Sequence, residues 1–255
     1  MYSLPALILR LSVGACSALT ACASVSTRHG STLTTEARLQ VAETADASGD
    51  SDLAISMYTA AAASEPNNIA LQLRCADALA RSGKITQARQ LLTERLRTSR
   101  GQPDLIRALA LVDLVAGQLA QAVAEFDQIL ATNPDDMRAL IDKAVALDLR
   151  GQHAAAQAIY QQVLATVPND PAARNDLAIS MMLEGRTNQA LETLAPMQDE
   201  DGSPQRLKVN LGILYAATGN VERSRQLLGD RISDGDLSAL TRALASSVTE
   251  DRAGP

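Results

Sequence analysis

Residues 137–170 read MRALIDKAVALDLRGQHAAAQAIYQQVLATVPND, and the pattern of this stretch recurs along the chain. Its glycine, Gly151, belongs to a series in which glycine returns every 34 positions. The series comprises Gly49, Gly83, Gly117, Gly151, Gly185 and Gly219. A fixed period of this length is typical of arrays of helical repeats. The chain is therefore predicted to be a stack of similar helical units.

Small and bulky residues keep the same register around each glycine. Seven positions before the glycines stand Ala42, Ala76, Ala110, Ala144, Ala178 and Gly212. Five positions after them stand Ala54, Ala88, Ala122, Ala156, Ala190 and Ser224. Nine positions after them stand Tyr58, Leu92, Phe126, Tyr160, Leu194 and Leu228. This register predicts two helices per repeat that approach closely at the small residues, with each glycine in a left-handed cap that ends the first helix.

These columns resemble the tetratricopeptide repeat, whose family pattern has a small residue at position 8, glycine near 15, alanine at 20, an aromatic residue at 24 and proline at 32. The best local match is NLGILYAATGN at residues 210–220, although the chain has no tryptophan. The resemblance implies an all-α superhelical solenoid of six helix-turn-helix repeats. In this register the repeats occupy residues 35–68, 69–102, 103–136, 137–170, 171–204 and 205–238.

The sequence also marks the junctions between repeats and the end of the array. Prolines fall where a second helix should stop, at Pro66, Pro134 and Pro168. Acidic pairs at the repeat junctions, Asp135-Asp136 and those within residues 199–201, are expected to cap helix N-termini. After the last repeat, a shared helical face predicts a C-terminal capping helix, which occupies residues 239–255 together with the tail. Its apolar residues begin at Leu237 and continue with Leu240, Leu244 and Val248.

The N-terminus predicts an export signal, because Arg10 precedes an apolar stretch at residues 11–21 and then Cys22. The residues Leu19, Thr20, Ala21 and Cys22 resemble a bacterial lipobox. The resemblance implies a signal peptide at residues 1–21, cleavage before Cys22, and a diacylglycerol and an N-acyl chain on that cysteine. Residues 22–34 would then form a lipidated flexible tether.

Two alternatives to this lipobox are less compatible with the sequence. A second box ending at Cys16 leaves a short apolar core and places Arg10 on its wrong side. A spanning helix needs about 20 mostly apolar residues, and polar residues interrupt this stretch. Ala23 and Ser24 follow Cys22, and the resemblance to Gram-negative lipoproteins implies the outer membrane because no aspartate follows the cysteine at the second position.

Composition and motifs argue against several function classes. The formal net charge of −6 disfavours nucleic acid as a partner. Cys75 shares its register position with apolar residues, so we expect a small core residue there and not a reactive thiol. The two histidines, His29 and His153, have no obvious catalytic company, and no metal or nucleophile motif is present. We therefore predict neither catalysis, nor a metal, nor a small-molecule substrate, nor a cofactor beyond the acyl chains.

The tetratricopeptide resemblance also implies a binding groove, formed mainly at positions 2, 5, 9 and 12 of each first helix. These positions are acidic in repeats one and two, at Glu43, Asp46 and Asp77, and apolar in repeats three to six. The predicted binding residues are Leu111, Leu114, Ile141, Val145, Asn175, Ile179, Met182, Val209 and Ile213. Such a groove suits an amphipathic helix or an extended apolar peptide. The alternative is that these side chains pack against the neighbouring repeat.

Three stretches resemble a narrower family, the TadD-like lipoproteins of the tight-adherence (Tad, or Flp) pilus assembly system. They are ARNDLA at residues 173–178, LEGR at 183–186 and QRLKVNL at 205–211. The resemblance implies an outer-membrane pilotin that helps the pilus secretin to localise or multimerise. Two alternatives remain open: a tetratricopeptide pilotin of type IVa pili, and an envelope scaffold that recruits peptidoglycan hydrolases.

Overall fold

The computed structural model describes residues 33–197, 205–229, 232–233, 235–236 and 238–239. The chain divides into a unit that ends at Leu33 and a unit that begins at Thr34, and all of the helices described below belong to the second unit. The predicted signal peptide, the lipobox and Cys22 lie outside the described residues, as do the acidic run at 199–201 and nearly all of the predicted capping helix.

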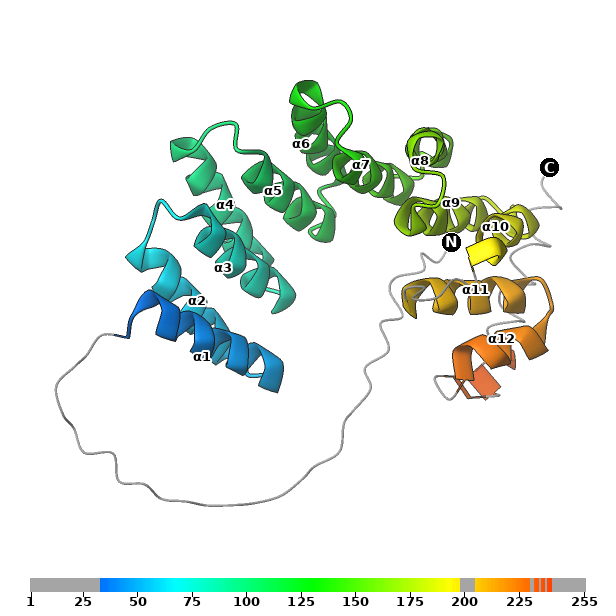
Figure 1. Cartoon of the computed structure of the whole chain (residues 1–255), viewed down its shortest axis with the longest axis horizontal. Helices are drawn as coiled ribbons and strands as arrows, with labels where there is room; N and C mark the ends of the chain where they lie inside the picture. Colours follow the sequence, from blue (N-terminus) through cyan, green and yellow to red (C-terminus); the bar gives the residue numbers. More distant parts are fainter. Residues whose placement is uncertain (1–32, 198–204, 230–231, 234, 237, 240–255) are drawn as a thin grey trace, which may run out of the picture. The chain divides into compact units, whose positions relative to one another are not determined.

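Within the described residues, the chain forms α-helices in six consecutive pairs and no strand (Figure 1). The pairs are α1 (Thr35–Ser48) with α2 (Ser51–Ser64), α3 (Ile69–Arg81) with α4 (Ile85–Thr98), α5 (Pro103–Val115) with α6 (Leu119–Thr132), α7 (Met137–Leu149) with α8 (His153–Thr166), α9 (Pro171–Leu183) with α10 (Thr187–Leu194), and α11 (Gln205–Ala217) with α12 (Val221–Leu228). A 3-10 helix, Ala195–Met197, follows α10. The predicted all-α solenoid is confirmed.

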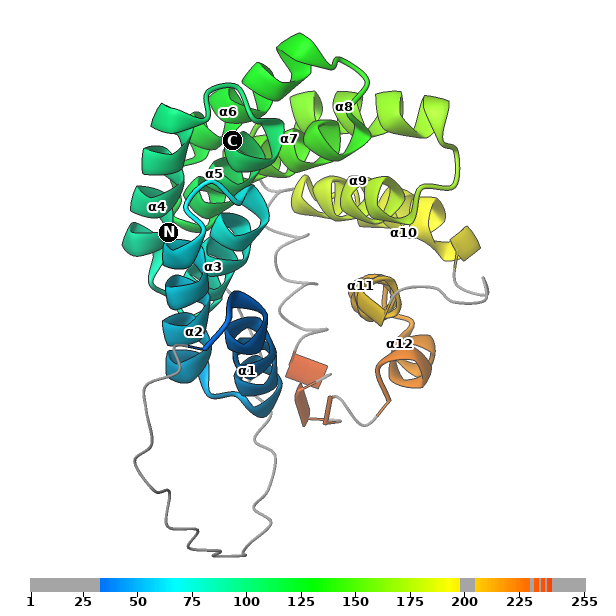
Figure 2. The same ribbon diagram turned by 60° about the vertical axis from the view of Figure 1, so that its left-hand side comes forward.

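The helices stack in chain order. Each helix contacts the next one along the sequence, and the first helices of repeats two to six also contact one another in succession. Figure 2 shows the same stack after a turn of 60°. Since every repeat adds its first helix beside the previous first helix, equivalent positions of successive repeats form rows along the array.

Gly151 shows why each pair turns at a glycine. Its φ is 74°, in the left-handed region, and the N–H of the next residue, Gln152, donates to the Leu147 carbonyl at 2.9 Å. This bond closes the C-terminus of α7 as in a Schellman motif. A Cβ added to Gly151 would meet nothing within 4 Å, so the backbone conformation, and not crowding, requires glycine here. All six glycines of the series have φ between 74° and 84°, which confirms the predicted caps.

The columns of small residues lie where the two helices of a pair touch. The alanines of both columns are at most 1% exposed, and Ser224 is fully buried. At Gly212, which replaces alanine in repeat six, an added Cβ would lie only 2.7 Å from Cγ of Leu228. Close helix approach therefore requires the small side chains, as the register predicts.

Polar caps and prolines define the junctions between pairs. The Asp136 carboxylate accepts a hydrogen bond from the Ala139 N–H at 2.9 Å, so it caps α7. This bond confirms the capping role expected for that acidic pair. Pro66, Pro134 and Pro168 all lie between a second helix and the next first helix, as predicted.

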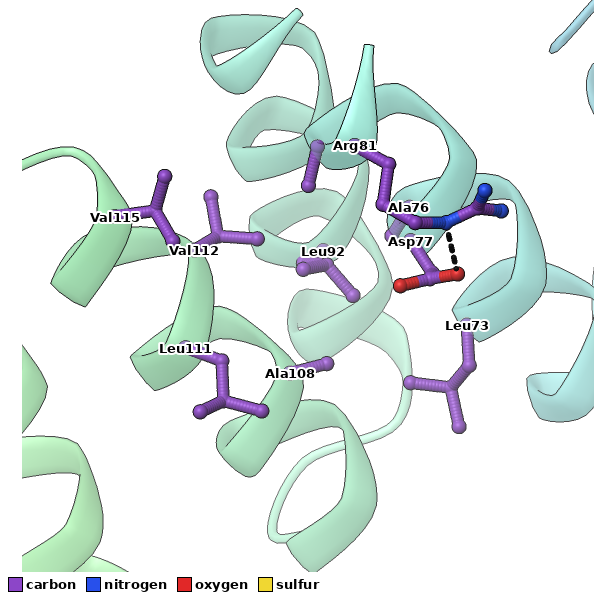
Figure 3. Close-up of a pocket in the computed structure, with 10 residues that line it drawn as sticks. Leu73, Ala76, Asp77, Arg81, Leu92, Ala108, Leu111, Val112 and Val115 are labelled. Carbon is purple, nitrogen blue, oxygen red and sulfur yellow. Dashed lines mark hydrogen bonds and ion pairs between the residues drawn. The ribbon is translucent and has the colours of Figure 1, made fainter. Parts of the chain in front are cut away.

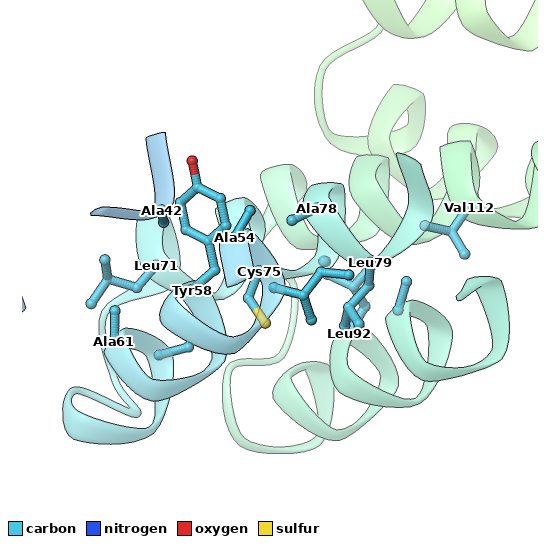
Figure 4. Close-up of a cluster of buried hydrophobic side chains, with 14 of the residues drawn as sticks. Ala42, Ala54, Tyr58, Ala61, Leu71, Cys75, Ala78, Leu79, Leu92 and Val112 are labelled. Carbon is cyan, nitrogen blue, oxygen red and sulfur yellow. The ribbon is translucent and has the colours of Figure 1, made fainter. Parts of the chain in front are cut away.

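Cys75 lies in the core between α2 and α3 (Figure 4). Its side chain is buried, and its Sγ is 3.5 Å from the Thr59 hydroxyl. Burial raises the pKa of the thiol above its usual value, which disfavours the reactive thiolate. The expectation of a small core residue is confirmed.

Candidate protein-binding face

In three consecutive repeats, the last residue of the first helix is a large aliphatic residue whose side chain is exposed to solvent. Val115, Leu149 and Leu183 are the last residues of α5, α7 and α9, and they are 66%, 56% and 56% exposed. They occupy position 13 of repeats three, four and five, so they recur at 34-residue intervals, and we call them the apolar row. Exposed apolar side chains gathered at one register position mark a candidate interaction site. The sequence prediction missed this row because it extended only to position 12 of each repeat.

A cavity of about 410 Å³ adjoins the row between α3 and α5. Leu73 of α3 and Leu111 and Val115 of α5 stand around it, and the short side chains of Ala76, Ala80 and Ala108 leave the space unfilled (Figure 3). Asp77 and Arg81 also line it and form an ion pair with each other at 2.9 Å. We call this hollow the α3–α5 cavity. It can receive a bulky apolar side chain from a partner.

The predicted groove residues lie beside the apolar row, and most are partly covered. Leu111 is exposed and lines the α3–α5 cavity. The half-buried members are Leu114, Ile141, Val145, Ile179, Met182, Val209 and Ile213. Several of these also pack against core clusters, namely Leu114, Ile141, Val145, Met182 and Val209. They therefore contribute to repeat packing as well as to the surface.

Asn175, also among the predicted groove residues, is only 3% exposed. Its amide nitrogen donates to Asp176 Oδ1, and its amide oxygen accepts from Asn210 Nδ2, both at 2.8 Å. The second bond joins α9 to α11. The side chain of Asn175 is thus already satisfied within the array.

The three carboxylates at the predicted groove positions of repeats one and two, Glu43, Asp46 and Asp77, are paired with arginines. Arg81 contacts Asp46 at 2.7 Å and Asp77 at 2.9 Å, and Arg74 forms an ion pair with Glu43. Hydrogen bonding to the Arg81 guanidinium is the main cause of the lowered pKa of Asp46. The arginines stand at positions 6 and 13, outside the positions from which an acidic groove was predicted. This part of the face therefore carries ion pairs and not a bare acidic surface.

His153 lies in a cluster of polar side chains. Its Nδ1 lies 2.8 Å from Asp148 Oδ1, and the Ser180 hydroxyl donates to the same oxygen at 2.6 Å. Tyr160 donates its hydroxyl to Asp148 Oδ2 at 3.1 Å. Ser180 comes from the next repeat, 32 residues away, which sequence spacing did not reveal. Because the serine donates to the carboxylate and not to the histidine, this cluster lacks the nucleophile–base contact of a catalytic triad.

A second buried polar cluster joins α4, α5 and α6. Asp113 is 0% exposed and accepts hydrogen bonds from Arg89 Nε at 2.6 Å and Nη2 at 3.3 Å. Glu125 of α6 lies nearby. Burial, reinforced by the negative charge of Asp113, raises the pKa of Glu125 to about 7, and Arg89 opposes this effect. The cluster therefore holds an acid that titrates near neutral pH.

The described part of the chain has neither the side-chain grouping of a metal site nor a helix with the pattern of a membrane span. No group of three or more His, Cys, Asp or Glu side chains there is placed to hold a metal ion. None of its helices has the length and apolar character needed to cross a bilayer.

Comparisons with known proteins agree with this architecture. Residues 47–112, 113–178 and 149–208 each match the family model described as "Tetratricopeptide repeat". Similar solved structures include PilW, a widely conserved type IV pilus biogenesis factor, at 20% identity and a TM-score of 0.65 over 81% of this chain and 97% of that one. TTC0263, a thermophilic tetratricopeptide repeat protein of Thermus thermophilus, has 18% identity and a TM-score of 0.60 over 71% and 98%.

MamA is similar at 17% identity and a TM-score of 0.50 over 65% of this chain and 90% of that one. Identities this low indicate a shared fold alone. No curated protein sequence matches the chain significantly.

Proposed function

Since the chain belongs to the tetratricopeptide repeat family, we propose that this interaction scaffold assists assembly of a tight-adherence (Tad, or Flp) pilus. In this proposal Cys22 carries a diacylglycerol and an N-acyl chain, which together anchor the protein stably. The anchor places the array at the outer membrane of a Gram-negative cell, facing the periplasm. The partner is the pilus secretin, which the scaffold helps to localise or to multimerise. The role is one of binding, without catalysis.

The apolar row, together with the α3–α5 cavity, is the observation that carries the proposal. Burying one such aliphatic side chain contributes roughly 1–2 kcal/mol, since each is already partly covered. Packed helices lie about 8–10 Å apart, and two turns of an α-helix rise about 10.8 Å. An amphipathic partner helix with an apolar residue at every seventh position can therefore meet successive members of the row. Shielding such a helix until the secretin assembles would be the contribution of the scaffold.

The pilus assignment draws support from two sources. The stretches at residues 173–178, 183–186 and 205–211 resemble the Tad lipoproteins. PilW, a type IV pilus biogenesis factor, has the same fold over most of this chain. The likeness to PilW makes type IV pilus assembly the second candidate, and secretins of the two systems tested side by side would separate them.

The decisive experiment measures detergent-resistant secretin multimers in outer membranes. We expect deletion to remove the multimers and the wild-type copy to restore them. The double variant Leu149→Asp/Leu183→Asp should fail to restore them, because it places two charges in the apolar row. Val167→Asp is the matched control, since Val167 is also an exposed aliphatic residue but follows α8 and lies outside the row. Unchanged multimers after deletion would contradict the secretin role, and co-purification of peptidoglycan hydrolases would then favour the hydrolase scaffold.

The anchor is tested separately. Cys22→Ala should yield a folded protein that no longer fractionates with the outer membrane and that behaves like the deletion. Circular dichroism checks that the helices remain. Normal outer-membrane fractionation of this variant would remove the lipid anchor from the proposal without affecting the binding face.

A further inference from the structure

Among the described residues, none covers the outer face of α1, the first helix of the array. An open groove of about 380 Å³ runs along it, lined by Ala37, Gln40, Val41, Thr44, Ala45 and Ser48 of α1 and by Leu53 of α2. We call this groove the α1 outer face. None of these seven side chains is charged, and Leu53 is exposed. The face lies apart from the apolar row, whose residues belong to α5, α7 and α9.

In the later repeats, the positions equivalent to those of the α1 outer face are covered by the preceding second helix. In α3 the residues at positions 3, 7 and 10, namely Leu71, Cys75 and Ala78, are buried in the core cluster that α2 shares (Figure 4). The three equivalent residues of α11 are buried leucines. In α1 the same positions are taken by Ala37 and Val41, which are half-buried, and by Thr44, which is exposed. Among the described residues no helix precedes α1, so none of them takes the position that the preceding second helix holds in every later repeat.

The internal junctions also indicate the chemistry of the missing side chains. Ala139 and Ala173 occupy position 3 of their repeats, as Ala37 does in repeat one. Ala139 shares a core cluster with Ile129 of α6, and Ala173 shares one with Val163 of α8. In both junctions the alanine therefore shares its buried cluster with a β-branched aliphatic residue of the preceding second helix. The occupant of the α1 outer face should present the same kind of stripe.

The charge of repeat one indicates which kind of helix would fit the α1 outer face. Repeat one, residues 35–68, contains six acidic residues and one basic residue, Arg38. Glu43, Asp46 and Asp52 pair with basic residues of repeat two. Glu36 and Asp50, near the two ends of the groove, have no basic partner within the described part of the chain. A second copy of this chain would bring like charges together, whereas Lys or Arg beside the aliphatic stripe of a partner helix would be attracted.

We infer that the α1 outer face docks an amphipathic α-helix of a partner protein, with a Val, Ile or Leu stripe flanked by Lys and Arg. The helix takes the position of a preceding second helix and extends the array by one element. A single helix face buries less than the roughly 800 Å² per partner of a standard stable interface. The contact is therefore weak by itself and adds affinity when the same partner also binds the apolar row.

Fluorescence anisotropy with three labelled peptides tests this inference. Each peptide has about 18 residues, a length at which helices form in water. One peptide has Ile and Lys in amphipathic helical order, the second replaces Lys with Glu, and the third scrambles the first. We expect the first to bind the full chain at least about tenfold more tightly than the other two. Equal affinity of the ordered and scrambled peptides would overturn the inference, because it would mean that charge alone attracts them.

Variants locate the contact. Gln40→Lys/Thr44→Lys should weaken binding of the Ile–Lys peptide several-fold, and both residues are exposed, so folding is retained. Gln161→Lys/Gln162→Lys changes the charge equally on an exposed part of α8 and should have no effect. Leu149→Asp should also have none, which separates this site from the proposed secretin site. Loss of binding with Leu149→Asp alone would overturn the inference, as would a dimer in sedimentation velocity that Gln40→Lys/Thr44→Lys abolishes.

Discussion

Repeats one and four contain the same contact in two different settings. The Tyr58 hydroxyl donates to Asp46 at 3.4 Å, and the Tyr160 hydroxyl donates to Asp148 at 3.1 Å. In both repeats the tyrosine is at position 24 and the aspartate at position 12. No other repeat has either residue at these positions. The pair is thus a unit that ties the second helix of a repeat to the end of its first helix.

The two units have different further partners. Asp46 receives the guanidinium of Arg81, whose side chain is half exposed, so this junction is an ion pair open to water. Asp148 is largely covered and receives the Ser180 hydroxyl together with His153. The Arg89–Asp113 pair between repeats two and three is a third kind of contact between neighbouring repeats, and its carboxylate is fully buried. The first junction therefore depends on exposed charges, whereas later junctions depend on buried polar groups, which are costly to leave unpaired.

Arg89→Met should have the largest effect, because it leaves the buried Asp113 carboxylate without its cation. We expect a loss of about 3 kcal/mol in the free energy of unfolding, measured by urea denaturation followed by circular dichroism. The matched control is Arg81→Met, which breaks exposed pairs and should cost less than about 1 kcal/mol. Equal losses would remove the distinction between the two kinds of junction. Adding Asp113→Leu to Arg89→Met should restore much of the stability.

Asp148→Ala should cost about 2 kcal/mol, since the Tyr160 and Ser180 hydroxyls both lose a largely buried acceptor. Asp46→Ala should cost about half as much, because Arg81 can turn to water and retains Asp77. Hydrogen exchange should show faster opening of α8 and α9 in the first variant and of α1 and α2 in the second. A larger effect at Asp46 would reverse the comparison.

Glu125→Gln tests whether the buried junction responds to pH. The raised pKa of Glu125, about 7 against a usual 4.5, means that the folded state holds this proton more tightly than the unfolded state. The favourable contribution is complete below about pH 4.5 and is lost as pH rises through 7. The variant should therefore melt a few degrees above the wild type at pH 8 and show no gain at pH 5. The neighbouring charges are Asp113 on α5 and Arg89 on α4, and a gain at both pH values would contradict this assignment.

Salt should weaken the ion pairs between repeats one and two, and its effect on stability should be the smallest of those predicted. The double variant Arg74→Met/Arg81→Met should lose less than about 1 kcal/mol at low ionic strength. The loss should shrink further at about 0.5 M NaCl, where exposed charges are screened over a few ångströms. The Arg89→Met loss should persist in the same buffer because its carboxylate is buried. If the loss of unfolding free energy in Arg74→Met/Arg81→Met did not depend on salt, it would point to lost packing of the arginine stems.

Much of the fold was predictable from local pattern. The glycine caps and the two small-residue columns follow from residue type and register, and each is found where the 34-residue period places it. The candidate site was predicted less well. The Tyr–Asp coupling and the apolar row do leave a signal, since both recur in register. The contact of Ser180 with Asp148 leaves none, because Ser180 belongs to a different repeat and has no counterpart elsewhere in the series.

The helix pairs, their length, their turns and the faces along which they pack are all specified by the amino-acid sequence. These features depend on backbone conformation and on side-chain size within one repeat, so the sequence of each repeat specifies them independently. Only the packed array shows which polar groups pair across repeats, which aliphatic residues at helix ends stay exposed, and that no described residue covers the outer face of α1. Those outcomes depend on how one repeat is placed on the next, and side chains about 30 residues apart meet only after that packing has occurred.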